Sequence, residues 1–210
     1  MMTYLELIYK AGPVMWIILA AFLIAMTFFL KKLMQFHRDE INVPELLRGL
    51  RNTLQRNAIV EALSLCDNTP GPIAKLLGAA ILAYQNGGDL RSAMDDVAVV
   101  EIPRLERYIH FIGTVSFIMP LLGFLGTVIG MIEAFEATRI SSGMLPELAN
   151  AIGTALITTA AGLTGAVIGY IGHNYLVARL DMILLDMEKA AMEITSICEQ
   201  QRNLPESRKK

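Results

Sequence analysis

Charged residues are scarce in this chain. Only 18% of its 210 residues are Asp, Glu, Lys or Arg, while 54% are hydrophobic and the mean hydropathy is +0.47. A soluble domain normally carries about 25% charged residues. The shortage of charge therefore argues against an ordinary soluble domain and makes a membrane protein the leading class.

The sequence also lacks the residue sets that enzymes and metal sites use. No Gly-rich phosphate loop follows a strand, no Cys/His set has metal-ligand spacing, and no Ser/His/Asp arrangement stands out. Cys66 and Cys198 fall in segments expected to be cytoplasmic, so we interpret them as small buried hydrophobic residues rather than a disulfide. We therefore expect no enzyme activity, no cofactor, no metal site and no nucleic-acid partner.

Three windows of at least twenty residues contain no charged residue and no His: Ala11–Leu30, Phe111–Ile132 and Leu148–Gly172. Helices of that length can each cross a hydrocarbon core of about 30 Å. A signal peptide is the alternative for the first window. Its apolar core is too long for one, however, and Lys31 and Lys32 follow it where a small-residue cleavage site would stand.

The distribution of Lys and Arg predicts the orientation. Ten of the eighteen lie between the first two windows, six follow the third, and only one lies between the second and third. Positive residues favour the cytoplasmic side. The expected layout is a periplasmic N-terminus at 1–10, transmembrane helices at 11–30, 109–137 and 148–176, a helical cytoplasmic loop at 31–108, a periplasmic loop at 138–147 and a cytoplasmic helix and tail at 177–210.

Breakers divide the long loop into helices. NTPGP at 68–72 and NGG at 86–88 predict turns, and Asp89 is placed to cap the helix that follows. We find no strong stop before the second window, so we expect this helix to run on into the membrane. Bends are expected at Pro103 and Pro120.

Two further patterns concern the loop and the tail. Asp95, Asp96 and Glu101 face different directions on a helix and are interpreted as a solvated surface. After the third window, apolar residues recur in steps of three and four, which is typical of a helical packing seam. The seam either packs against the loop helices or contacts another subunit; its members are Val177, Leu180, Leu184, Met187, Ala191, Ile194 and Cys198.

Small residues form one face of each of the second and third spans. At about 100° per residue, Ser116, Pro120, Gly123, Gly130 and Ala134 lie within about 60° of Thr127. The third span has a similar face, made by Ala151, Thr154, Thr158, Ala161, Gly162, Gly165, Gly169 and Gly172. Leu156, Leu163, Val167 and Tyr170 lie opposite.

Such faces have two interpretations. In lipid, small residues let helix backbones approach closely, and the first interpretation is that this packing is their whole role. The faces also carry hydroxyl groups at mid-depth, on Thr127, Thr154, Thr158 and the flanking Thr159, which could line a narrow polar path. A hydroxyl does not carry a proton as a charge, whereas intramembrane relays use Asp, Glu or His. If ions cross here, another chain must supply the carboxylate.

Ionisable residues flank the charge-free windows of the spans rather than lie inside them. Glu133 and Glu136, at the outer end of the second span, either concentrate protons at a pore mouth or are solvated interfacial carboxylates. His110 and His173, at the inner ends, are interfacial residues or accept a proton that leaves the path.

Two motifs carry a resemblance to a known family. MPLLGFLGTVIGMIEAF at 119–135 and AIGTALITTAAGLTGAVIGYIGHN at 151–174 resemble the second-span and third-span motifs of the MotA/TolQ/ExbB proton-channel family. ExbB and TolQ are the nearer match, since MotA has four spans. The resemblance implies an all-α homopentamer around a central pore, with three spans and long cytoplasmic helices in each subunit.

The resemblance also implies partners and roles. Two copies of a single-span ExbD- or TolR-like protein would supply an intramembrane Asp, and a TonB- or TolA-like protein would transmit the work across the periplasm from the bacterial inner membrane. Thr127 and Thr159 match the pore threonines of the family. Pro120 would bend the helix; the residues expected to pack tightly at the pore face are Gly123, Gly126, Gly130, Gly162 and Gly165.

The sequence departs from the family motif at one position, and two other functions are alternatives. Many ExbB and TolQ proteins carry a Glu at the position of Thr154, so this chain supplies no acid there. A non-conducting membrane scaffold would use the small faces for packing alone. A small-solute transporter is disfavoured because the spans show no internal repeat. The sequence does not distinguish H⁺ from Na⁺ as the coupling ion.

Overall fold

The structure is a computed structural model that describes residues 12–39, 41–140 and 145–202. In these ranges every regular element is a helix, and this confirms the expected all-α fold. The helices are α2 (Gly12–Asp39), α3 (Val43–Gln55), α4 (Ile59–Asn68), α5 (Pro72–Gln85), α6 (Leu90–Glu106), α7 (Ile109–Ile140) and α8 (Leu145–Arg202). The expected N-terminal segment 1–10, residues 141–144 of the second loop and the tail 203–210 lie outside the described residues.

Three helices, α2, α7 and α8, contain stretches long and apolar enough to cross a membrane. Within the most apolar window of each, only 22% to 28% of the residues are buried inside the chain. Most of this apolar surface is therefore left for lipid or other chains to cover. The chain is accordingly a multi-pass membrane protein, as the sequence predicts.

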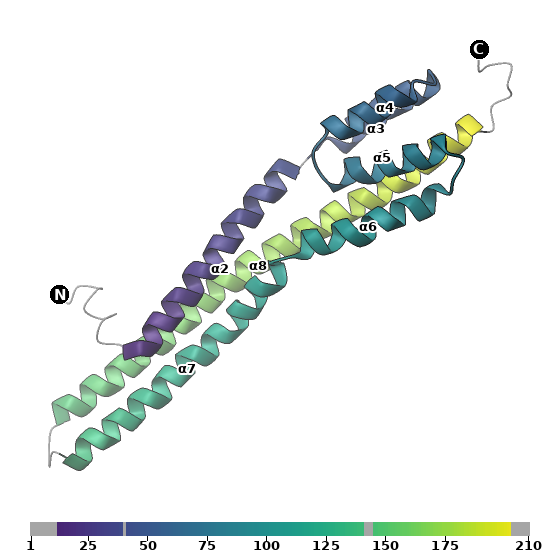
Figure 1. Ribbon diagram of the computed structural model, residues 1–210. Coiled ribbons are helices and arrows are strands. Elements are labelled where there is room, and N and C mark those ends of the chain that lie inside the picture. Colours follow the sequence, from purple (N-terminus) through teal and green to yellow (C-terminus); the bar gives the residue numbers. More distant parts are fainter. Residues whose placement is uncertain (1–11, 40, 141–144, 203–210) are drawn as a thin grey trace. The chain divides into compact units, whose positions relative to one another are not determined.

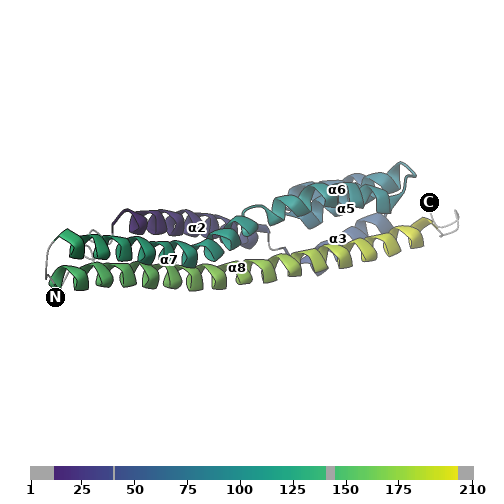
Figure 2. The same cartoon turned by 90° about the horizontal axis from the view of Figure 1, so that it is seen from below.

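The chain forms two compact units, which we describe separately. Of the described residues, 12–32, 108–140 and 145–176 form the spanning unit, and 33–39, 41–107 and 177–202 form the loop unit. In the spanning unit α2, α7 and the first part of α8 lie side by side (Figures 1 and 2). The second part of α8 belongs to the loop unit.

The spanning unit turns its large side chains outward. Phe117, Phe124, Leu156 and Tyr170 are each more than 60% exposed. The buried glycines of α7 and α8 are Gly123, Gly126, Gly130, Gly162 and Gly165. This arrangement is the reverse of a soluble helical bundle. It fits a bundle whose surroundings are as apolar as its own side chains.

The loop unit packs like a soluble helical domain. Helices α3, α4, α5 and α6 contact one another in sequence order. Their apolar residues are at most 2% exposed at Leu50, Leu54, Leu77 and Ile81. These residues form the apolar core of the loop unit.

The seam on the second part of α8 is confirmed in part. Of the seven predicted positions, four are buried, namely Leu180, Met187, Ile194 and Cys198. Ala190 and Ile197, which the step pattern omitted, are buried as well. Arg51 of α3 donates to Glu193 of α8 at 3.0 Å, which favours packing against the loop helices.

The two predicted turns of the loop are confirmed. Asn68 ends α4 and Pro72 begins α5, with Gly71 at a φ of 106° that a side chain would strain. The second turn, at 86–88, has Gly87 at a φ of 69°. Asp89 then caps α6, since its carboxylate accepts a hydrogen bond from the Arg91 backbone N–H at 3.1 Å.

The expectation that the helix after Asp89 runs on into the membrane is wrong. Helix α6 ends at Glu106 and α7 begins at Ile109. Tyr108 adopts a left-handed φ of 73°, which breaks the helical path. Its ring stacks on Phe28 of α2 with centroids 4.8 Å apart. A Tyr gives no sequence signal for a helix end. We therefore attribute the break to the packing of Tyr108 against Phe28.

The interpretation of Glu101 as a solvated residue is also wrong. Its side chain is only 12% exposed and accepts hydrogen bonds from Lys75 of α5 at 2.9 Å and from Arg104 at 3.0 Å. Lys75 and Arg104 remain more than half exposed. The buried Glu101 carboxylate therefore links α6 to α5 through its ion pair with Lys75. It also pairs with Arg104 of its own helix.

Replacing Glu101 tests this contact. Glu101→Gln keeps the shape but removes the charge, and we expect the loop unit to lose about 1–2 kcal/mol of stability, since water screens the two exposed cations. The midpoint of thermal unfolding in detergent measures it. The matched control is Asp96→Asn, an exposed acid of the same helix; equal midpoints for the two variants would contradict the assignment.

The two cysteines of the loop unit offer a test of burial. Burial raises the pKa of the Cys66 and Cys198 thiols from 9.0 to about 11. Asp67 adds to the rise at Cys66, whereas at Cys198 the positive charge of Arg202 lowers the pKa and Glu199 raises it. Because the folded pKa is the higher one, the neutral thiols stabilise the fold below pH 9 and lose that contribution as the pH rises toward 11. We expect slow iodoacetamide alkylation at pH 8 before unfolding and fast alkylation after it, as read by mass spectrometry.

Candidate functional site

The two small-residue faces meet each other inside one subunit. A Cβ added to Gly162 of α8 would lie 2.7 Å from the carbonyl oxygen of Met119 and 2.9 Å from the Cα of Gly123, both on α7. Ordinary Cβ contacts exceed 3.4 Å. Only glycine permits α7 and α8 to approach this closely, so this crossing sets the spacing of the two helices.

Other small residues continue the contact on both sides of the crossing. A Cβ on Gly126 would collide with the Thr158 side chain, and one on Gly130 would lie 2.7 Å from the Cβ of Ala155. On the other side, a Cβ on Gly165 would collide with the sulfur of Met119. These predicted glycines therefore pack two helices of the same subunit. The sequence pattern alone does not distinguish this use from packing between subunits.

The hydroxyl groups of three predicted threonines lie in or beside the contact between α7 and α8. Thr159 donates a hydrogen bond across the helices to the carbonyl of Gly123 at 2.9 Å. Thr158, which is 2% exposed, donates to Ala155 of its own helix at 2.7 Å, and Thr154 donates to Ala151 at 2.9 Å. The hydroxyl hydrogens of all three are thus already used within the subunit.

Thr127 occupies a different place from the other threonines. It is half-buried, bonds to the Phe124 carbonyl of its own helix, and lines an outward groove of about 450 Å³ between α7 and α8. Every other residue of that groove is apolar: Phe124, Val128, Met131, Ile132, Phe135, Ile152, Ala155 and Leu156. Pro120, inside α7, is also half-buried. Thr127 supplies the one side-chain hydroxyl in an apolar groove that the subunit leaves open.

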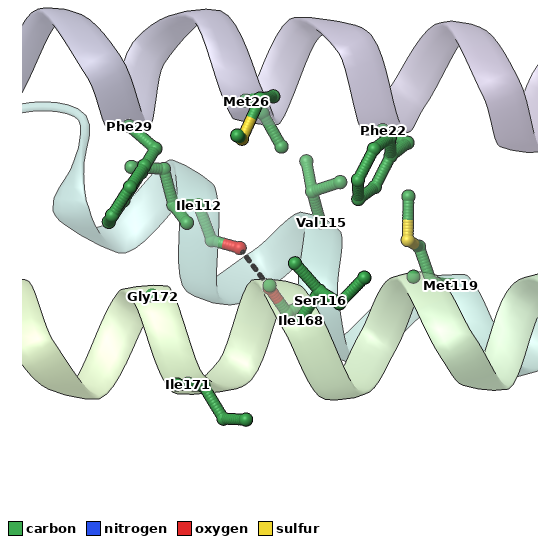
Figure 3. Close-up of a pocket in the computed structure, with 13 residues that line it drawn as sticks. Phe22, Met26, Phe29, Ile112, Val115, Ser116, Met119, Ile168, Ile171 and Gly172 are labelled. Carbon is green, nitrogen blue, oxygen red and sulfur yellow. Dashed lines mark hydrogen bonds between the residues drawn. The ribbon is translucent and has the colours of Figure 1, made fainter.

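A second, mostly apolar cavity of about 250 Å³ lies among α2, α7 and α8 (Figure 3). Phe22, Met26 and Phe29 of α2 point into it from one side. Its only polar side chain, Ser116, donates to the Ile112 carbonyl at 2.8 Å, the dashed line in Figure 3. Because a single hydroxyl oxygen is the only polar side-chain atom available to solvate a charge, this cavity is unsuited to an ion.

A small polar pocket of about 30 Å³ lies nearer the Glu136 end of α7. Glu133 and Thr154 line it together with Thr158, and the first turn of α2, at Gly12 to Val14, closes it. Glu136 is not among its lining residues. Glu133 and Thr154 lie on different helices, so their spacing in the sequence does not predict that they share a pocket.

The two histidines differ in their surroundings. His110 is exposed. The His173 ring packs over Gly113 of α7, where a Cβ would lie 2.7 Å from its Nε2, and its buried Nδ1 has no hydrogen-bond partner among the described residues. Within those same residues no group of three His, Cys, Asp or Glu side chains could hold a metal ion.

The glycine crossing makes a sharp prediction. Gly162→Ala should destabilise the protein by about 1–3 kcal/mol because α7 and α8 must separate, even though Ala improves the helix propensity by about 1 kcal/mol. The matched control is Gly153→Ala on the same helix, where an added Cβ meets no described atom within 4 Å. Thermal unfolding in detergent compares them, and a Gly162→Ala midpoint at or above that of Gly153→Ala would refute the close approach.

Comparison with known proteins places these helices in a family. Residues 68–189, which include α7 and the first part of α8, match the MotA/TolQ/ExbB proton channel family. The chain is 26% identical to a putative biopolymer transport protein ExbB homolog of Methanothermobacter thermautotrophicus, over 85% of this chain and 64% of that protein.

Two further relatives carry related names. Identity is 35% to the Tol-Pal system protein TolQ of Haemophilus influenzae, over 48% of this chain and 45% of that protein. The chain is also 26% identical to the biopolymer transport protein ExbB of Neisseria gonorrhoeae, over 70% of this chain and 73% of that protein. The chain spans less than two thirds of the length of the first two relatives. It belongs to the MotA/TolQ/ExbB proton channel family, on the side of ExbB and TolQ.

Proposed function

We propose that this chain is the channel-forming subunit of an ion-driven motor in the bacterial inner membrane. With an ExbD- or TolR-like partner it would form a proton channel that couples the proton motive force to energised transport or envelope integrity, without enzyme activity. Family membership and the names of the relatives support this proposal. The observation that carries it is Thr127, the sole hydroxyl-bearing residue in an open apolar groove.

We propose that the subunit assembles as a homopentamer through the outward faces of α7 and α8. Phe124 and Leu156, which line the groove, are 65% and 61% exposed in the single subunit. The glycine faces are already used between α7 and α8, so contact between subunits would fall to these large apolar residues. Thr127 would then lie beside the axis of the pentamer, with Thr159 behind it on α8.

A second protein is needed for the chemistry. The three charge-free windows hold no group that can carry a proton as a charge, and a hydroxyl only passes a hydrogen bond along. Two copies of a single-span partner would supply an Asp. A charge at the bilayer centre costs about 2.5–3.5 kcal/mol on insertion scales. A Thr lining reduces that cost, and about 2.3 kcal/mol per 100 mV is available to drive each charge across.

The proposed orientation follows from the distribution of Lys and Arg. The N-terminus and the loop near 138–147 would face the periplasm, and the loop unit would lie in the cytoplasm. A TonB- or TolA-like protein would receive the work on the periplasmic side. We propose H⁺ as the coupling ion, with Na⁺ as the outcome to be distinguished by experiment.

A non-conducting scaffold is the second candidate. The observation in its favour is that Thr154, Thr158 and Thr159 all use their hydroxyl hydrogens inside the subunit. Small faces that pack one helix against another require no pore. The two candidates differ at Thr127, because a scaffold needs no hydroxyl in the open groove.

The test replaces Thr127 in the protein co-purified with its partner and reconstituted into vesicles. Thr127→Val keeps the shape and removes the hydroxyl, so we expect proton flux under an imposed membrane potential to fall about tenfold, the effect of losing one hydrogen bond to a charged group. Flux is read with a pH-sensitive dye inside the vesicles.

Thr164→Val is the matched control. Thr164 is exposed, and its hydroxyl donates to the Ala160 carbonyl of its own helix at 2.8 Å, much as Thr127 bonds within α7. We expect this variant to conduct like the unaltered protein. Full proton flux in the Thr127→Val variant would contradict a pore role for Thr127. Absence of proton flux in the unaltered complex would favour the scaffold.

A further inference from the structure

The mostly apolar cavity among α2, α7 and α8 is shaped like a slot along the helices. Its lining residues lie within 22–29 of α2, 112–119 of α7 and 165–172 of α8. All three stretches belong to the spanning unit. Each stretch covers about 10 Å of helix rise, or about one third of the hydrocarbon core of a membrane.

Missing side chains on α8 and two aromatic rings of α2 create this space. Glycines of α8 line the cavity, among them Gly165 and Gly172. A Cβ on Gly172 would lie 3.1 Å from the Phe29 ring, and one on Gly165 would lie 3.6 Å from the Phe22 ring. The two rings stand at the two ends of the cavity, with Met26 between them (Figure 3). Both rings therefore rest on α8, and the cavity is the space that remains between them.

The cavity is open to the surroundings of the spanning unit. Met26 of α2 and Ile168 of α8 line it and are 39% and 47% exposed. Ile112 and Met119 of α7 also line it, but they are only 2% and 1% exposed. A molecule beside the unit can therefore enter past Met26 and Ile168 and reach side chains that the three helices otherwise cover.

The walls and the size of the cavity favour an apolar occupant. Ser116 is the only polar side chain of the lining, and its hydroxyl hydrogen is used on the Ile112 carbonyl. The volume of about 250 Å³ exceeds the roughly 150 Å³ of an engineered apolar cavity that stays dry and binds benzene. An empty cavity would deprive its walls of van der Waals contacts. The apolar molecules that surround a membrane-spanning unit are lipids, and a flexible acyl chain fits a slot of this shape.

The depth of the cavity indicates which leaflet supplies the lipid. The charge-free window of α2 ends at Leu30, one residue after Phe29, and the exposed Lys31 follows. The membrane surface on that side therefore lies close to the Phe29 end of the cavity. The Phe22 end lies deeper, toward the middle of the window. A lipid with its headgroup at the level of Lys31 would place the first part of an acyl chain beside the cavity.

We propose that this cavity binds one acyl chain of a phospholipid from the leaflet on the Lys31 side. The site goes beyond the proposed function, because a non-conducting scaffold would carry it as well as a channel. The bound chain contacts all three helices at once, at Phe22 and Met26 of α2, Ile112 and Met119 of α7, and Ile168 of α8. Since lipid offers no hydrophobic drive between helices, these contacts help to attach α2 to the pair formed by α7 and α8.

The test is photolabelling by a phospholipid probe. The full-length protein, gently extracted from its own membrane with its partners, is reconstituted into phosphatidylglycerol vesicles. A small fraction of the lipid carries a diazirine in one acyl chain, and mass spectrometry of peptides locates the label after illumination. We expect label on Ile112 and Met119, which are too buried for lipid around the helices to reach, and also on Phe117, which is 76% exposed.

A variant that fills the cavity is compared with a matched control. Ala25 lines the cavity and is 7% exposed, so Ala25→Phe places a ring inside it. The label on Ile112 and Met119 should fall by about tenfold because the ring occupies the space of the chain, whereas the label on Phe117 should not change. The control is Ala20→Phe, at an exposed position of the same helix outside the lining, which should leave all three labels unchanged.

Two results would overturn the proposal. Label confined to outward residues of the unaltered protein would show that no acyl chain enters, whether the cavity is empty or filled by a side chain of a second copy. Equal labelling of Ile112 and Met119 in Ala25→Phe and Ala20→Phe would show that the label does not come from the cavity.

Folding is checked by gel filtration and thermal unfolding of each variant. If Ala25→Phe does not fold, Ala25→Leu fills the cavity with a smaller side chain and should lower the label on Ile112 and Met119 in the same way; an unchanged label would contradict the site. The labelling requires no ion flux. Failure of the proposed function therefore leaves this site testable, and failure of the site leaves the proposed function standing.

Discussion

The close approach of α7 and α8 at Gly123 and Gly162 is the constraint on which the spanning unit depends. Lipid offers no hydrophobic drive for two helices to associate, so van der Waals contact and hydrogen bonds between them must hold the pair. The crossing provides both, because the missing side chains bring the backbones together and let Thr159 donate to the Gly123 carbonyl at 2.9 Å. A methyl group on either glycine would remove the contact and weaken the bond.

Because the small residues of α7 and α8 face each other, the large apolar side chains of these helices face outward. With the small residues used inside the subunit, Phe117, Phe124 and Leu156 must face outward, together with the groove that holds Thr127. The loop unit follows the opposite rule, since it buries Leu50, Leu77 and Ile81 and keeps most charges on its surface. One chain thus combines a bundle that buries small residues and exposes large apolar ones with a helical domain that buries large apolar residues.

Local signals made much of this fold predictable, and long-range contacts account for the rest. The charge-free windows, the two Gly/Pro turns and the Asp89 cap all act within a few residues, so the sequence reveals them. The break at Tyr108 depends on Phe28 in another helix, and the burial of Glu101 depends on Lys75, 26 residues away. The sequence placed Thr127 and Gly123 on one face, but only the packed helices separate the open groove from the buried crossing.

The number of subunits in the native complex tests the account most directly. Native mass spectrometry of the tagged protein, gently extracted from its own membrane, measures that number and detects bound partners. The account predicts five copies of this chain with two copies of a small single-span protein that carries an intramembrane Asp. A monomer or dimer without such a partner would contradict it.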